Sequence, residues 1–403
     1  MIQFLRRHRV ILLAILIAAA YYPRFIRRPD GMTLYPLGAE ALLHGESLER
    51  GAPGFTYPPV VALVMIPLVP LPMWLKNLTW YLVLVASTYW SFRLCERLVI
   101  HEFPKLKEEK KAIRWRILGL LLSLKFILAV LENQAYDSLV LLAVLVGLRG
   151  MQMRKDIQAA LGIALAAALK VTPLLFLPYL LWKRRVKLFV LSAVFFTGIS
   201  FLPDALFVQK GATSGYFVTW VADIAGGTIP TKASETQPRH WDLVNPLNQS
   251  LRGFVYQLTA GPEAHAYRKP IFYSTCITYI LIVFVLIVLS VQIPRALLID
   301  SCLLLISMLM LSPMSSKSHF VSIMLPYIAA SAYVIAEPRM RKIGGGLLIV
   351  SFFLESLTSK DLIGKRLADI CSSIGCVTIG TLVMVVFFGY VVVKHRMDRP
   401  AHV

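Results

Sequence analysis

The stretch Tyr273–Val291, YSTCITYILIVFVLIVLSV, contains no charged residue and is long enough to cross a lipid bilayer as a helix. A helix needs roughly 20 mostly apolar residues to span about 30 Å of hydrocarbon. Inside lipid, every backbone N–H and C=O must be hydrogen-bonded within the protein, so such a stretch is a helix or part of a closed barrel. Its length and its lack of polar and apolar alternation indicate a helix. We therefore expect an all-α membrane protein.

Similar apolar segments recur along the 403-residue chain, which is 57% hydrophobic and only 16% charged. Soluble globular domains have about 25% charged residues. We therefore predict a single integral membrane domain over residues 1–403, with about twelve membrane-spanning helices. The predicted segments are 10–22, 59–72, 74–99, 116–131, 136–149, 158–182, 187–202, 271–291, 296–311, 319–336, 343–357 and 373–393.

The net charge of +20 is concentrated at the ends of these segments. Lys and Arg in short loops mark the cytoplasmic side and also bind anionic lipid head groups, so the charge does not indicate nucleic acid binding. The strongest clusters are 6–9, 183–187, 339–342 and 394–399. Segment 10–22 lacks a small-residue cleavage site, so we interpret it as a retained span. If all four clusters are cytoplasmic, both termini are cytoplasmic in an inner membrane, and 23–58 and 203–270 are extracytoplasmic loops.

The path of the first half leaves two arrangements open. If every segment crosses once, the basic loop 101–116 lies outside, against the charge rule. If 59–72 enters and leaves on one side, and 158–182 is a hairpin of two short helices bent at Lys170–Pro173, that loop lies inside. Segment 59–72 is short and rich in proline, which suits re-entry.

The loop after the first segment places an acid at the expected membrane surface. It contains Arg28, Asp30 and Tyr35, then the amphipathic stretch Gly38–Gly45, and Tyr57 at the return into lipid. A carboxylate held at this surface can act as a base toward a lipid head group. A solvated loop aspartate beside Arg28 explains the same residues, so both interpretations stay open.

Two further polar groups interrupt apolar segments, where an ionisable side chain costs about 2.5 to 3.5 kcal/mol. Glu132–Gln134, with Asp137 close behind, is either a polar turn or a set of hydrogen-bonding side chains for a ligand. Lys170 precedes Pro173, which removes a helix hydrogen bond. Lys170 is either paired with an acid, extended toward the interface, or a ligand for a phosphate group.

The turn Ser312–His319 places Lys317 and His319 at the expected outer surface. A histidine with a near-neutral pKa can serve as a general base, and a serine-rich capping turn is the alternative. The loop 203–270 mixes aromatic residues such as Trp220 with Asn, Gln, Asp and Arg. That composition suits sugar recognition, although interfacial aromatic residues also anchor membrane proteins.

Taken in this order, the landmarks resemble glycosyltransferase family 87, the polyprenyl-phosphate-sugar-dependent enzymes that include α-mannosyltransferases of phosphatidylinositol mannoside synthesis. The matching pieces are Asp30 with Tyr35 and Ala39–Gly45, Tyr57-Pro58-Pro59 with Pro67, Asn133-Gln134, Ala166–Pro173, Asn248–Leu251, and Ser312-Pro313-x-Ser315 with His319. The family commonly carries Ser-Pro-x-Ser-Trp with two adjacent histidines. Here Ser316 replaces the tryptophan and Ser318 replaces the first histidine.

The resemblance implies an all-α, polytopic C-type (GT-C) glycosyltransferase fold with outer-face loops and a juxtamembrane helix. It implies an inverting transfer of a hexose, with mannose as the prevalent sugar, from a polyprenyl-phosphate donor to a lipid or glycan acceptor on the extracytoplasmic face. A transporter or flippase of lipid-linked sugars, or a polysaccharide polymerase or ligase, is the alternative.

An inverting transfer needs a base for the acceptor hydroxyl and cations for the leaving phosphate. The expected base is Asp30 or His319. The expected ligands of the donor phosphate are Lys170, Arg252, Lys317 and Arg28. The expected contacts to sugar or acceptor are Tyr35, Tyr57, Asn133, Gln134, Asn248 and Gln249. The sequence shows no metal-ligand spacing, so we expect neither a metal nor a cofactor.

Overall fold

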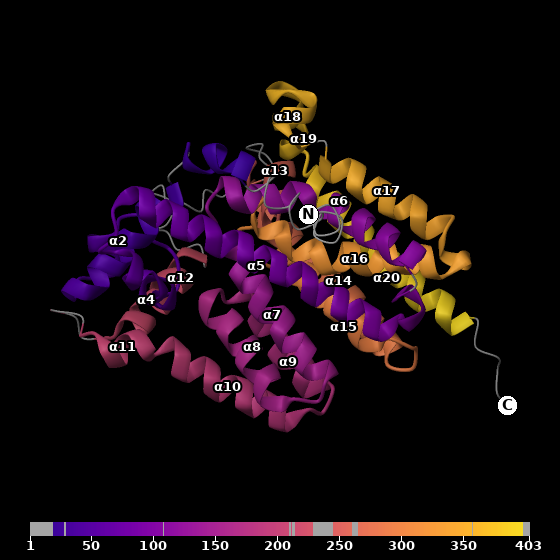
Figure 1. Ribbon diagram of the computed structural model, residues 1–403, viewed down its shortest axis with the longest axis horizontal. Helices are drawn as coiled ribbons and strands as arrows, with labels where there is room; N and C mark the ends of the chain where they lie inside the picture. The colour runs from indigo at the N-terminus through magenta and orange to yellow at the C-terminus, as the bar shows by residue number, and fades with distance from the viewer. Residues whose placement is uncertain are drawn as a thin grey trace, which may run out of the picture.

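The computed structural model describes residues 19–27, 30–107, 109–208, 211, 214–228, 245–259, 265–356 and 358–397. All regular secondary structure within these ranges is helical, which confirms the expected all-α fold (Figure 1). The long helices run side by side, and the short helices α18 and α19 stand out from the bundle. Residues 19–26 form the last turns of a helix that leads into the first loop.

The first half contains both long and short helices. They are α2 (Asp30–His44), α3 (Leu48–Gly51), α4 (Pro59–Met65), η1 (Ile66–Leu68), α5 (Met73–Glu102), η2 (Pro104–Lys107), α6 (Glu109–Glu132), α7 (Asp137–Gln152), α8 (Asp156–Leu169), η3 (Thr172–Leu175), α9 (Phe176–Trp182) and α10 (Val186–Ser200).

The second half likewise contains both long and short helices. They are α11 (Leu202–Leu206), α12 (Tyr216–Thr228), α13 (Leu251–Leu258), α14 (His265–Ser290), α15 (Ala296–Met310), η6 (His319–Ile323), α16 (Met324–Ala336), η7 (Pro338–Met340), α17 (Ile343–Ser356), α18 (Lys360–Ile363), α19 (Lys365–Ser373) and α20 (Cys376–Met397).

Three stretches of the described residues are long and apolar enough to cross a membrane: Tyr267–Ser290, His319–Ala336 and Cys376–Met397. Shorter apolar helices accompany them, at Pro59–Leu68, Asp156–Leu169, Thr172–Trp182, Val186–Ser200, Ala296–Met310 and Ile343–Ser356. These lengths agree with a polytopic membrane protein. The expected total of about twelve spans stays a prediction.

Polar contacts divide the bundle into two ends. At one end, which we call the cavity end, Lys170 after α8 pairs with Asp137 at the start of α7. At the other, which we call the far end, the Gln152 side chain donates to the Glu102 carboxylate at 3.0 Å, and Arg295 donates to the Glu102 carbonyl at 3.0 Å. The helices between these contacts therefore run antiparallel to one another.

The positions of these contacts favour the second arrangement, in which 59–72 enters and leaves the membrane on one side and 158–182 forms a hairpin. Pro59–Leu68 spans about 15 Å at 1.5 Å per residue, half the thickness of the hydrocarbon, so it does not cross once. The expected bend is present, because α8 ends at Leu169 and α9 begins at Phe176. The α5 helix runs from the cavity end, where the Trp80 indole donates to the Gln134 carbonyl, to Glu102 at the far end. The basic loop after α5 consequently lies at the far end.

The helices α7 and α8 approach closely because small residues face each other. A Cβ added to Gly162 would lie 2.4 Å from the Gly147 nitrogen, and one added to Gly150 would lie 2.5 Å from the Ala159 nitrogen. Small residues of this kind allow two helix backbones to pack together inside a membrane. The close packing fixes the start of α7 beside the end of α8 and so brings Asp137 to Lys170.

Candidate active site

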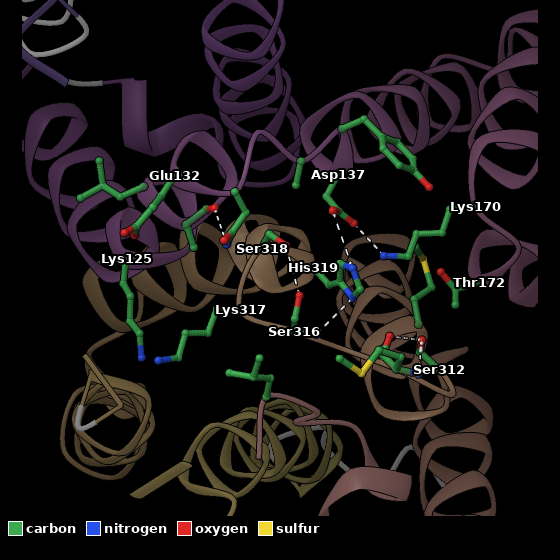
Figure 2. Close-up of a pocket in the computed structure, with 18 of the residues that line it drawn as sticks. Lys125, Glu132, Asp137, Lys170, Thr172, Ser312, Ser316, Lys317, Ser318 and His319 are labelled. Carbon is green, nitrogen blue, oxygen red and sulfur yellow. Dashed lines mark hydrogen bonds and ion pairs between the residues drawn. The ribbon is translucent and has the colours of Figure 1, made fainter. Parts of the chain in front are cut away.

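A cavity of about 1410 Å³ lies at the cavity end of the bundle. It is larger than the roughly 300–1,000 Å³ usual for small-molecule sites. Its charged lining residues are Arg24, Lys125, Glu132, Asp137, Lys170, Lys317, Lys360 and Asp361, and His319 joins them. Figure 2 shows that the labelled side chains come from several helices and from the turn Ser312–His319. His319 lies near the centre of the view, with Asp137 and Lys170 on one side and Lys125 and Lys317 on the other.

The first group is centred on a buried carboxylate. Asp137 is 6% exposed and begins α7, where the helix dipole favours a negative charge. The Lys170 ammonium lies 2.7 Å from one oxygen of Asp137, and the His319 Nε2 lies 3.9 Å from the other. Lys170 reaches this position because the backbone leaves helical geometry there, at φ −156° and ψ 127°. The lysine charge is therefore balanced by the acid.

The orientation of the His319 ring bears on its chemistry. Its Nδ1 accepts a hydrogen bond from the Ser316 backbone N–H at 3.2 Å. A nitrogen that accepts from an N–H carries no hydrogen, so the hydrogen of the neutral ring is on Nε2. That nitrogen faces Asp137. In this geometry His319 has no free lone pair for a base, which differs from the expectation for this residue, and it supports Asp137 instead.

The second group is a pair of lysines that face each other. Figure 2 shows the ammonium ends of Lys125 and Lys317 pointing together. Lys125 donates to the Glu355 carbonyl and the Thr358 hydroxyl, and Lys317 donates to the Thr358 carbonyl. Within the described part of the chain, neither ammonium forms an ion pair with a carboxylate. Two cations held this way at a cavity wall can bind an anion.

The electrostatics of Lys317 agree with a role in anion binding. Burial lowers the pKa of Lys317, and the charge of Lys360 lowers it further. The negative charges of Asp369, Glu132 and Asp361 act in the opposite direction and do not outweigh these effects. A bound phosphate would favour the charged form of the lysine.

An aromatic wall closes another side of the cavity. The Tyr35 ring packs edge-on against Tyr57, Trp80 and Tyr136, with centroids 5.2, 5.9 and 5.8 Å away. Burial raises the pKa of Tyr57, so its hydroxyl stays protonated at neutral pH. The neighbouring Asn133 is exposed to the cavity, and its amide nitrogen donates to the Ala129 carbonyl. Tyr35, Tyr57 and Asn133 thus line the cavity, and their contact with a sugar stays a prediction.

Gln134 has a different position from the one expected for a sugar contact. The side chain is completely buried, accepts from the Met32 backbone N–H at 2.8 Å and donates to the Phe25 carbonyl at 3.1 Å. It therefore fixes the start of α2, where Asp30 is the first residue. The side chain of Asp30 and the whole of Arg28 lie outside the described part of the structure.

Asn248 and Gln249 fasten the turn Ser312–His319 to the end of loop 203–270. The Asn248 side chain donates to the Pro313 carbonyl and accepts from the Ser315 N–H. The Gln249 side chain donates to the Ser372 carbonyl, and its backbone N–H donates to the Ser315 carbonyl. Both residues are buried, so they position the turn and do not reach the cavity.

Arg252 does not line the cavity either. It is 8% exposed, and its guanidinium lies 5.7 Å from the centre of the Tyr256 ring. This corrects the expectation that Arg252 binds the donor phosphate. Lys125 was missed, although a charged residue inside the apolar segment 116–131 was a visible signal. Arg24 was missed as well, and it bridges Glu132 and Asp361 at the cavity mouth.

Comparison with known proteins supplies an independent observation. The sequence profile described as glycosyltransferase family 87 matches residues 55–313, which is more than half of the chain. A search of curated proteins finds no match. Among solved structures, the chain is similar to the crystal structure of ArnT from Cupriavidus metallidurans bound to undecaprenyl phosphate. The two are 13% identical with a TM-score of 0.42, over 96% of this chain and 78% of that chain.

Proposed function

Because the chain belongs to glycosyltransferase family 87, we propose that it transfers a hexose from a polyprenyl-phosphate-sugar donor to a lipid or glycan acceptor. We propose mannose as the sugar, inversion at the anomeric carbon, and a reaction at the extracytoplasmic face of the inner membrane. The observation that supports the proposal is a cavity that combines two lysines, neither in an ion pair with a described carboxylate, with a buried carboxylate.

The reaction assigns a separate task to each group. The acceptor hydroxyl oxygen forms a bond to C1 of the sugar while the bond between C1 and the phosphate oxygen breaks. The electron pair leaves with polyprenyl phosphate, whose charge Lys125 and Lys317 stabilise. The hydroxyl proton passes to a carboxylate that acts as general base.

The base is a carboxylate at the cavity end, either Asp30 or Asp137. Asp137 lines the cavity and is held by Lys170 and His319. His319 is a positioning residue in this scheme, because its Nδ1 is occupied by the Ser316 N–H. Lys170 is the partner of Asp137 and not a phosphate ligand, since its charge is already balanced.

The remaining expected residues divide into two roles. Tyr35, Tyr57 and Asn133 form the wall against which the sugar lies. Gln134, together with Asn248 and Gln249, holds the loops that carry the reacting groups.

The test uses the purified full chain in lipid vesicles with radiolabelled mannosyl polyprenyl phosphate and a membrane extract as the acceptor source. We expect a labelled product with a new glycosidic bond. Asp30→Asn and Asp137→Asn are compared with Val194→Ala, a lipid-facing control on α10 that is 60% exposed. Loss of transfer in either acid variant, with the control unchanged, identifies the base. If both acid variants keep full activity, the site assignment is wrong.

The same assay separates the alternatives. A transporter or flippase would move the labelled lipid across the vesicle membrane without forming a glycosidic bond. A polymerase or ligase would accept only a diphosphate-linked oligosaccharide donor. Either result would exclude the proposed monophosphate-dependent transfer.

A further inference from the structure

We infer that Cys371 and Cys376 form a disulfide bond, which joins the end of α19 to the start of α20 and fixes the corner that supports the turn Ser312–His319. The inference rests on the proposed function in one respect, because that proposal places the cavity end outside the cytoplasm. Disulfides form and persist in oxidising compartments of that kind and are rare in the cytoplasm.

The backbone between the two helices brings the cysteines together. The α19 helix ends at Ser373, and α20 begins at Cys376. Between them Gly375 has a left-handed φ of 73°, and its N–H donates to the Ser372 carbonyl at 3.2 Å. This is the Schellman ending of a helix, in which the residue after the glycine packs against the residue four positions before the glycine. Here those two residues are Cys376 and Cys371.

The side chains agree with this backbone geometry. Both cysteines carry free thiols in the structure, and the two thiols interact with each other. The turn is also held from outside, because a Cβ added to Gly375 would lie 2.3 Å from the Phe254 ring. A disulfide joins Cα atoms about 4.4 to 6.8 Å apart, so two cysteines that one turn has already brought together can form it with little backbone movement.

The surroundings of the pair favour its oxidation. Lys125, which lines the cavity, is close enough for its charge to act on both thiols. A neighbouring cation favours the thiolate, which is the attacking species in thiol–disulfide exchange. Cys371 is partly exposed, whereas Cys376 is 3% exposed, so an oxidant reaches Cys371 first.

The oxidant is a second protein that carries an exchangeable disulfide. The Cys371 thiolate attacks one sulfur of that disulfide and forms a mixed disulfide, and the other sulfur leaves as a thiolate. The Cys376 thiolate then attacks the Cys371 sulfur and releases the oxidant as a dithiol. Two electrons pass from the cysteines to the oxidant, and the protons of the two thiols balance those that its sulfurs take up.

The corner between α19 and α20 is connected to the turn Ser312–His319. The Gln249 side chain donates to the Ser372 carbonyl at 2.8 Å, and the Thr378 hydroxyl donates to the Gln249 carbonyl at 2.8 Å. The Gln249 backbone N–H donates to the Ser315 carbonyl within the turn. A disulfide beside Ser372 and Thr378 therefore fixes Gln249 and, through it, the turn.

The test measures the oxidation state of each cysteine in the full chain. Membranes of the producing cells are quenched with acid, and free thiols are blocked with N-ethylmaleimide in denaturant. The protein is then reduced, and each newly freed thiol receives a polyethylene glycol maleimide. We expect the wild type to gain two polymer chains on a denaturing gel, and peptide mass spectrometry to place them on Cys371 and Cys376.

The variants identify the pair. Cys371→Ser and Cys376→Ser should each gain no polymer chain, because the remaining thiol has lost its partner. Cys302→Ala is the matched control, because Cys302 also interacts with another cysteine, Cys95, but both are completely buried. It should gain two chains like the wild type. If Cys302→Ala loses the chains and Cys371→Ser keeps them, the bond belongs to the other pair and the inference is wrong.

A second measurement tests the effect on the corner. The α19 helix stands out from the bundle in Figure 1, and its Lys365 and Arg366 are exposed trypsin sites. Reduction of the wild type should speed cleavage at these sites about tenfold, because the end of α19 then opens more often. Cys371→Ser should be cut at the fast rate with or without reductant. Equal rates for reduced and unreduced wild type would show that no bond holds the corner.

The labelling requires no sugar donor, so its result is independent of the transfer assay. Wild-type protein that transfers sugar but gains no polymer chain would overturn the disulfide and leave the proposed transfer standing. Wild-type protein that gains two chains but forms no glycosidic bond would refute the proposed transfer and leave the disulfide standing.

Discussion

The two ends of the bundle use buried charge in opposite ways. At the far end, the Glu337 carboxylate pairs with Arg295 and with His395, and Arg339 adds a further contact. At the cavity end, Asp137 balances Lys170, but Lys125 and Lys317 face each other beside a large cavity. A largely buried acid paired with its cations holds helices together. Two cations that form no ion pair with a carboxylate can bind an anionic ligand.

The carboxylate at each end should respond differently to loss of its charge. Asp137→Asn should lower kcat by about 10²- to 10⁴-fold, the range for loss of a general base, and leave donor binding without acceptor unchanged. The comparison residue is Asp300, which is also buried and pairs with Lys183 at 2.8 Å. Asp300→Asn should lower the thermal stability and keep the kcat of the protein that remains folded. Steady-state kinetics and heating followed by size-exclusion chromatography measure both. If Asp137→Asn behaves like Asp300→Asn, Asp137 is structural and the contrast fails.

Removing a charge at the far end should lower the free energy of unfolding more than removing a charge at the cavity end. Burial acts against the charge of Glu337, but the hydrogen bond and charge of His395 and the charge of Arg295 outweigh it and lower the pKa of Glu337 to about 2. Glu337→Gln should therefore cost about 3 kcal/mol, the scale for removing one partner of a buried pair. Asp156→Asn is the control, because its pair with Lys187 is exposed and should contribute little.

The lowered pKa of Glu337 also predicts how the stability of the protein changes with pH. A carboxylate whose folded pKa is depressed stabilises the protein above its ordinary pKa of 4.5, and that stabilisation is lost as the pH falls from there toward 2. Thermal stability of the wild type should fall over this range, and the Glu337→Gln variant should lose this part of the dependence. Parallel curves for the two proteins would show that Glu337 does not carry the effect.

The lysine pair should show the reverse pattern of stability and binding. Lys317→Met removes a repelling charge, so the free protein should melt at a higher temperature than the wild type. Donor binding should weaken about 10- to 100-fold, the effect of losing one hydrogen bond to a charged group. Lys125→Met should do the same. A drop in stability without a change in donor affinity would mean that the pair is structural, like the far end.

The sequence was sufficient for the fold and for part of the site. Apolar segments predicted the helices, and Pro173 predicted the break after α8. The family assignment from short motifs was confirmed by the profile match. Tyr57, Lys317 and His319 were expected in the site and line the cavity, and their roles stay predictions. The predictions of the fold and the family succeeded because they depend on local composition and on order along the chain.

The sequence could not assign the partners of polar side chains. Gln134 and Asn133 are adjacent amides in one turn, yet one is buried against the Phe25 carbonyl and the other faces the cavity. Asn248 suits a sugar hydroxyl as well as it suits the Pro313 carbonyl that it binds. The choice between backbone and ligand is made by segments far away in the sequence. For the same reason the pairing of Lys170 with Asp137 was one of several open alternatives.

The smallest expected effect concerns the pH dependence of donor binding. Burial and the charge of Lys360 lower the pKa of Lys317, against the charges of Asp369, Glu132 and Asp361. As the pH rises toward this lowered pKa, the protonated fraction of Lys317 falls, so donor binding should weaken at a lower pH than for an ordinary lysine. Lys317→Arg should bind the donor with little pH dependence, because a guanidinium stays charged. Equilibrium binding of labelled donor from about pH 6 to 9 measures the difference, because Lys317→Arg lacks the part of the pH dependence that Lys317 carries. If the wild type and Lys317→Arg give the same curve, Lys317 keeps its proton in the free protein. The positive charge at the cavity end is then shared among Lys125, Lys317 and Lys360 and is not concentrated on one residue.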